Sequence, residues 1–119
     1  MKVFVSTLFA LFFICSCNES NCVKNHFFDL KFRYSLDVID VSENGQDVFI
    51  DDKLNAMYFL KVVTGHESQI EDIEYPLYKN QSLYLQDKKK WEEWYTNHRC
   101  SLSDHEIDSL LLAYKSLFD

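Results

Sequence analysis

The sequence predicts a mostly α-helical protein: one small domain of about four helices, preceded by a signal peptide. Three observations predict this fold class. The 119 residues include only two glycines and one proline, too few turn-forming residues for a many-turned β-sandwich. Three segments space their apolar residues as a helix does, and one of them begins with a helix-capping motif. The length suits a single domain, which we expect to span residues 26–119.

The first 16 residues have the three parts of a secretory signal. Lys2 supplies a positive charge, a largely apolar run extends from Val3 to Ile14, and small and polar residues follow. The run is shorter than the roughly 20 residues that a membrane-spanning helix needs. We therefore interpret residues 1–16 as a signal peptide and not as a permanent membrane span.

The segment from Ile14 to Cys17 is similar to a lipobox, the signal of bacterial lipoproteins. An aliphatic residue stands three places before Cys17, and the small Ser16 stands directly before it. The Cys17 thiolate would accept the lipid, and the chain would be cut before this residue. Residues 17–25 would then form an acylated N-terminus and a short polar tether. Cleavage without lipidation, which would release a secreted protein, is the alternative.

Residues 27–41 fit two kinds of secondary structure. Apolar and polar residues alternate from Phe28 to Val38, as in a half-buried strand. On a helical wheel, however, Asp29, Arg33 and Asp37 gather on one face. We predict a helix and keep as the alternative an α+β fold with a short strand near 28–38. A partner strand could then come from residues 82–86.

Two further helices are predicted in the middle of the chain. One spans about residues 49–64 and is apolar nearly all round, as a central helix is, with Gly65 as its left-handed stop. The other spans about residues 88–98, with Asp87 as its N-cap. Between Gly65 and Asp87 we expect an irregular stretch, because Pro76 prevents a helix through it.

The last predicted helix begins with a capping box. The Ser103 hydroxyl can accept from the Glu106 amide, and the Glu106 side chain can return to the Ser103 amide. Apolar residues follow at helical spacing, and we expect the face that they form to be buried. These residues are Ile107, Leu110, Leu111, Tyr114, Leu117 and Phe118.

Residues 53–98 resemble a group of small bacterial cell-envelope lipoproteins of unknown function. The matching pieces are Ala56 to Gly65, where an aromatic helix ends in Thr-Gly, and Asp87 to Asn97, which follows the pattern D-x-x-x-W-x-x-W-Y-x-x-N. His66 stands where the group has an apolar residue. The resemblance implies a mostly helical fold and a location in the cell envelope as a lipoprotein. It implies no catalytic residues.

The net charge and the cysteine content limit which partners and which redox compartment suit the protein. Removal of Lys2 with the signal changes the formal charge from −7 to −8, which disfavours nucleic acid and leaves the lipid as the attachment to the membrane. Once Cys15 has left with the signal and Cys17 has taken lipid, Cys22 and Cys100 remain. In an oxidising compartment one disulfide between them is the default, and two free thiols are the alternative.

The aromatic face of the 88–98 helix is the candidate binding surface. Trp91, Trp94 and Tyr95 lie on one face, where aromatic residues either pack into a core or anchor an interface. Core packing is the more common role of such residues beside an apolar helix. Tyr75, Tyr78 and Tyr84 could complete a groove with them.

The sequence contains no motif that specifies catalysis, a cofactor or a metal. The spacing of His98, Cys100 and His105 matches no paired-ligand zinc pattern. We therefore predict a non-enzymatic envelope lipoprotein that binds an unknown protein partner or has a structural role. The alternative is a periplasmic inhibitor or immunity protein that captures a basic toxin or hydrolase by electrostatic steering.

Overall fold

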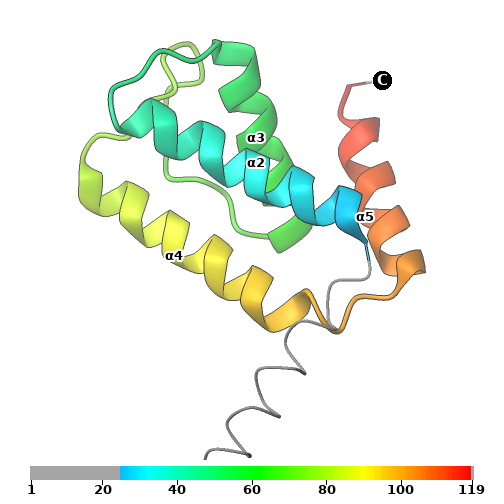
Figure 1. Cartoon of the computed structure of the whole chain (residues 1–119). Helices are drawn as coiled ribbons and strands as arrows, with labels where there is room; N and C mark the ends of the chain where they lie inside the picture. Colours follow the sequence, from blue (N-terminus) through cyan, green and yellow to red (C-terminus); the bar gives the residue numbers. More distant parts are fainter. Residues whose placement is uncertain (1–24, 119) are drawn as a thin grey trace, which may run out of the picture.

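The computed structural model describes residues 25–118, and in this part of the chain it contains four α-helices and no strand (Figure 1). They are α2 (His26–Glu43), α3 (Ile50–Thr64), α4 (Gln81–His98) and α5 (Asp104–Ser116). The predicted mostly α fold is confirmed, and the alternative strand near 28–38 is wrong. Within the described residues, none of the helices combines the length and apolar composition that a bilayer crossing requires.

The segment 27–41, whose sequence fits a strand or a helix, belongs to helix α2 and places its apolar residues on different faces of that helix. Asn25 caps it, because the side-chain oxygen accepts a hydrogen bond from the Phe28 amide at 3.0 Å. Phe28 and Phe32, one turn apart, are buried, whereas Leu30 and Tyr34 are exposed. The alternation in the sequence therefore reflects two different faces of one helix.

Helix α3 lies at the centre of the domain and packs against the three other helices. Phe59 and Leu60 are fully buried within it. It ends as predicted, at Gly65 in the left-handed conformation with φ of 75°. A residue with a Cβ atom is disfavoured there by its own backbone, which is why glycine stops the helix.

Helix α4 begins seven residues earlier than predicted. Its N-cap is Asn80, whose side chain accepts from the Leu83 amide at 3.0 Å. Asp87, the predicted N-cap, lies inside the helix, and residues 82–86 are helical. The three lysines 88–90 consequently lie in mid-helix. There Lys88 and Tyr84 both donate hydrogen bonds to Asp40 of α2, and these bonds, that of Tyr84 first, lower the pKa of this carboxyl.

Helix α5 has the predicted cap with one changed contact. Ser103 Oγ accepts from the Glu106 amide at 3.1 Å, but the Glu106 carboxylate receives the Ser103 hydroxyl, also at 3.1 Å, in place of its amide. Ile107 is buried against the core, and the apolar face is only partly covered beyond it. Leu117 and Phe118 follow the end of the helix and are exposed, so the expectation that they are buried is wrong.

Candidate interaction cleft

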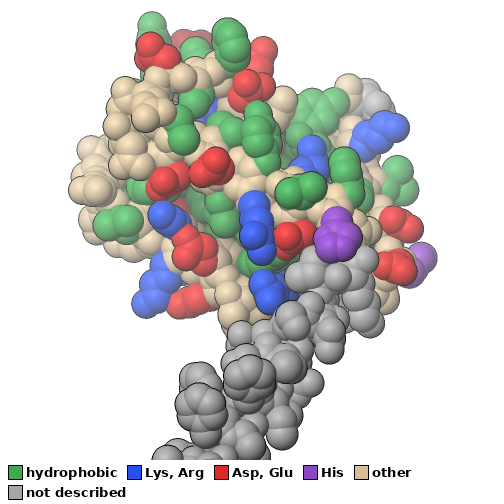
Figure 2. All heavy atoms as spheres, viewed as in Figure 1, with side chains coloured by type: hydrophobic (Ala, Val, Ile, Leu, Met, Phe, Trp, Pro, Cys, Tyr) green, Lys and Arg blue, Asp and Glu red, His purple; other side chains and the backbone are tan. Residues whose placement is uncertain are grey.

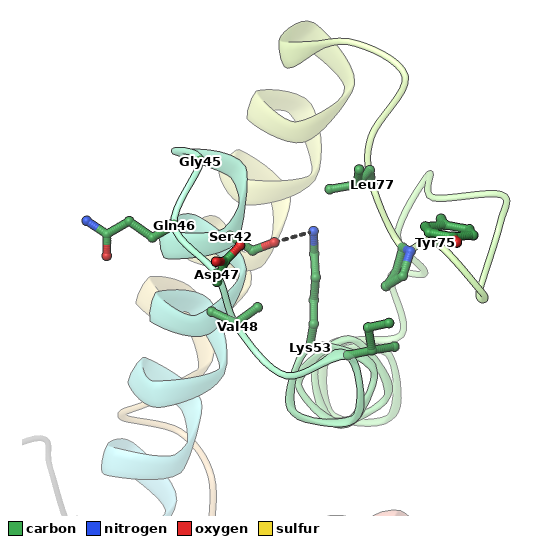
Figure 3. Close-up of a pocket in the computed structure, with 10 residues that line it drawn as sticks. Ser42, Gly45, Gln46, Asp47, Val48, Lys53, Tyr75 and Leu77 are labelled. Atoms are coloured by element: carbon green, nitrogen blue, oxygen red, sulfur yellow. Dashed lines mark hydrogen bonds between the residues drawn. The ribbon is translucent and has the colours of Figure 1, made fainter.

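A cleft of about 310 Å³ opens where the C-terminal end of α2, the start of α3 and the connector 65–80 meet (Figure 3). We call it the interaction cleft. Its walls come from two segments that are far apart in the sequence. They are residues Ser42, Gly45, Gln46, Asp47, Val48, Ile50 and Lys53 on one side, and Tyr75, Pro76 and Leu77 on the other.

A glycine turn forms the first wall. Helix α2 ends at Glu43, and the Gly45 amide donates to the Ser42 carbonyl at 3.1 Å. Gly45 has φ of 88°, a value that side chains with a Cβ atom rarely adopt. The chain then reverses into α3, whose N-cap Phe49 makes no side-chain capping bond and is 81 % exposed. The turn therefore leaves an aromatic ring uncovered between Val48 and Ile50 in the sequence, and both of these residues line the cleft.

A buried lysine stands in the middle of the cleft. Lys53 is only 2 % exposed, and its Nζ donates to Ser42 Oγ and to Glu43 Oε1, each at 2.8 Å (Figure 3 shows the bond to Ser42). Glu43 is itself largely buried. A buried ammonium group is tolerated only when it is paired and hydrogen-bonded. This pair joins the end of α2 to the first turns of α3 and leaves the cleft floor without net charge.

The connector forms the second wall by alternating its side chains. Pro76 and Tyr78 are buried and alternate with Tyr75 and Leu77, which are exposed and line the cleft together with Pro76. Just before them Asp72 Oδ1 accepts from the Glu74 amide at 2.9 Å, a local turn that directs the chain back toward the domain. The exposed ring and aliphatic side chain are thus held by buried neighbours.

Asp87 fixes the connector onto α4. Its carboxylate is fully buried and accepts from the Tyr78 hydroxyl at 2.7 Å and from the Gln69 amide at 2.7 Å. It also receives the Gln69 side chain at 3.0 Å and contacts His66 Nε2 at 2.8 Å. This role was missed, because an aspartate before an apolar helical face also has the pattern of an N-cap. The sequence does hold a signal, since Tyr84 continues the face of Trp91 upstream of Asp87.

The predicted aromatic surface is mostly core. Trp91 is fully buried, and its indole N–H donates to the His66 carbonyl at 3.0 Å, so it cannot contribute to a surface. Trp94 and Tyr95 are partly buried and stack on Phe32 of α2, with ring centroids 5.8 and 4.6 Å away. Core packing, the more common role, is the one that the structure shows for Trp91. A binding role of the half-covered Trp94 and Tyr95 stays a prediction.

Tyr75 and Tyr78 of the connector and Tyr84 of α4 do not form a groove with the tryptophans. Tyr78 and Tyr84 are buried, with ring centroids 5.4 Å apart. Tyr75 is the exposed member, and it lines the interaction cleft. The predicted groove is therefore wrong for two of its three members.

The predicted cysteine modifications involve residues outside the described part of the chain. Cys17 and Cys22 lie outside residues 25–118, so lipidation of Cys17 and a disulfide between Cys22 and Cys100 stay predictions. His98 Nδ1 is held by the Trp94 carbonyl at 2.8 Å, and its ring stacks on Trp94. Among the described residues, no three His, Cys, Asp or Glu side chains converge as a metal site would require.

The buried tyrosines make the domain sensitive to alkali. Burial and the hydrogen bond to Asp87 raise the pKa of Tyr78, and burial and the bond to Asp40 raise that of Tyr84. Their stabilising contribution is complete below the pKa of an unfolded tyrosine, about 10, and is lost as the pH rises toward the pKa of the folded state.

Above about pH 10 we expect the free energy of unfolding to fall by about 1.4 kcal/mol per pH unit for each of these two tyrosines. Urea unfolding measured over this range checks the slope. In the Tyr78→Phe variant this slope should be smaller by the contribution of one tyrosine. An unchanged slope would show that Tyr78 does not contribute to the alkaline loss of stability.

No protein-family model, no curated protein and no solved structure matches the chain.

Proposed function

We propose that the chain is a lipid-anchored envelope protein, acylated on Cys17, whose helical domain binds a partner protein through the interaction cleft. The observation that carries this proposal is the position of the cleft. It lies at the C-terminal end of α2, while the described chain begins at Asn25, directly before the other end of that helix (Figure 1).

The geometry suits a domain that is attached at one end and binds at the other. Helix α2 has 18 residues and therefore separates the two ends by about 27 Å. A lipid on Cys17 would hold the chain at its N-terminal side and leave the cleft accessible to other proteins. The resemblance to envelope lipoproteins supports the same location, at a membrane of the cell envelope.

The side chains around the cleft are those that anchor protein interfaces. Phe49, Tyr75 and Leu77 are exposed together with Ile50, which also lines the cleft. Exposed apolar side chains that gather in one place mark interaction sites more often than scattered ones do, and aromatic anchors contribute most of the energy of many interfaces. These features support a binding role.

Site-specific photocrosslinking in cells tests both parts of the proposal. A benzophenone side chain would replace Tyr75, which is 72 % exposed, and, as the matched control, Leu112 of α5, which is 69 % exposed. We expect one discrete adduct from position 75 in the membrane fraction and none of the same mass from position 112. Leu77→Ser should reduce the adduct, and Cys17→Ser should move the chain out of the membrane fraction.

Two results would contradict the proposal separately. Equal crosslinking from positions 75 and 112 would remove the cleft as the interface. Retention of the Cys17→Ser chain in the membrane would remove the lipid anchor.

A periplasmic inhibitor or immunity protein is the second candidate. The feature that favours it is Asp47 on the cleft wall, together with the carboxylates of the adjoining segments 51–52 and 72–74, which would attract a basic enzyme. The mass and identity of the crosslinked partner distinguish the two candidates, because an envelope partner belongs to the same cell and a toxin arrives from outside.

A further inference from the structure

One carboxylate, Asp47, lines the interaction cleft, and four more belong to the segments 51–52 and 72–74, which adjoin lining residues in the sequence. We call them the acidic rim, and they are Asp47, Asp51, Asp52, Asp72 and Glu74. Within residues 25–118 none of the five makes an ion pair, although eight ion pairs are present there. Figure 2 shows acidic side chains beside hydrophobic ones over the end of the molecule where α3 begins.

The basic side chains of the same two segments are already neutralised. Lys53 is held by Glu43 at 2.8 Å, and Lys79 is held by Glu71, also at 2.8 Å. Both lysines are therefore already paired with other carboxylates and not with the rim. Like charges that face water repel each other, and they attract cations from solution or from a partner.

Local structure accounts for the presence of three carboxylates of the rim but not for the presence of the other two. Asp51 and Asp52 lie in the first turn of α3, where the helix dipole favours negative charge, and Asp72 accepts from the amides of its own turn. Asp47 lines one wall of the cleft, and Glu74 directly precedes Tyr75, which lines the other wall. Neither carboxylate makes a side-chain hydrogen bond with the described residues, so neither has a structural role in the fold.

The cleft itself is shaped for side chains more than for a cofactor. Its volume of about 310 Å³ is at the lower limit of small-molecule sites, which span about 300–1,000 Å³. Val48, Ile50, Tyr75 and Leu77 give it apolar walls. A large apolar side chain could insert between them, since it would remove these exposed surfaces from water.

We propose that the interaction cleft binds a cationic polypeptide segment, in which lysine or arginine residues flank a large apolar side chain. The apolar side chain inserts between Ile50 on one wall and Tyr75 and Leu77 on the other. The flanking cations pair with Asp47 and Glu74. This proposal rests on the protein-binding function proposed above and specifies the chemistry of the partner.

A defined peptide tests the charge and the apolar parts separately. The probe is a hexapeptide with a leucine pair between two lysine pairs, labelled with an uncharged fluorophore, and the protein is the full processed chain in nonionic detergent. We expect Asp47→Asn combined with Glu74→Gln to weaken binding roughly fivefold at low salt, as expected for two lost exposed ion pairs. The matched control neutralises Asp37 and Asp108, which are exposed elsewhere, and should bind as the wild type does.

Further measurements complete the test. Leu77→Ser should weaken binding without changing its salt dependence, while a probe with glutamates in place of lysines should not bind. Equal weakening by the two double variants would show that net charge alone attracts the peptide and would overturn the proposal, as would absence of binding by the wild type. If crosslinking from position 75 succeeds while the probe fails, the protein-binding function stands and the cationic partner does not.

Discussion

Replacing Asp87 by alanine is expected to destabilise the folded domain by about 4 kcal/mol. The fully buried carboxylate accepts hydrogen bonds from the Tyr78 hydroxyl and the Gln69 amide, each at 2.7 Å. Its removal leaves these donors without an acceptor inside the domain, and each buried unsatisfied group costs about 1–3 kcal/mol. The connector would also lose its attachment to α4, so Tyr75 and Leu77 would no longer be held in the wall of the cleft.

Urea unfolding of the purified chain, followed by tryptophan fluorescence, measures the effect. Asp108→Ala on the exposed side of α5 is the matched control and should change the free energy of unfolding by less than about 0.5 kcal/mol. A double-mutant cycle with Tyr78→Phe should show coupling, because the two side chains share one buried hydrogen bond. A loss below about 1 kcal/mol for Asp87→Ala would show that the connector is not held by this carboxylate.

Asp87 also separates what local sequence patterns predict from what depends on tertiary contacts. The start of α5 and the glycine stop of α3 could be predicted because they depend on local signals, a capping serine and a left-handed glycine. The start of α4 was predicted too late, because an aspartate that caps a helix and one that is buried within it have the same local pattern. What decides between them is the connector, whose donors reach Asp87 from residues up to 21 positions away.

The interaction cleft could not be predicted for a related reason. Its walls come from residues 42–53 and 75–77, which share no motif or spacing. Lys53 looks like an ordinary surface lysine of α3, and only its position against the end of α2 brings Glu43 to its Nζ. The sequence did identify aromatic residues as candidates for binding. It could not decide which of them are exposed, since Trp91 and Tyr78 become buried through contacts between helix and connector.

The sequence of α2 fits a strand as well as a helix, and the packing of this helix depends on Phe32. This ring is fully buried and stacks on Tyr95 of α4 with centroids 4.6 Å apart. It also meets Phe59 of α3 edge-on at 6.4 Å. This one side chain therefore joins α2 to two other helices, α3 and α4. Aromatic pairs of this kind stabilise a fold beyond the area that they bury.

Phe32→Ala is accordingly expected to destabilise the domain by about 4 kcal/mol, the cost of removing a buried phenylalanine and leaving a cavity. Domains of this size are stable by only about 5–15 kcal/mol, so this variant should unfold at much lower urea concentration. Phe27→Ala, on the same helix at a position that is 65 % exposed, is the control and should change stability by less than about 0.5 kcal/mol. Similar losses in the two variants would mean that Phe32 does not hold α2 to α3 and α4.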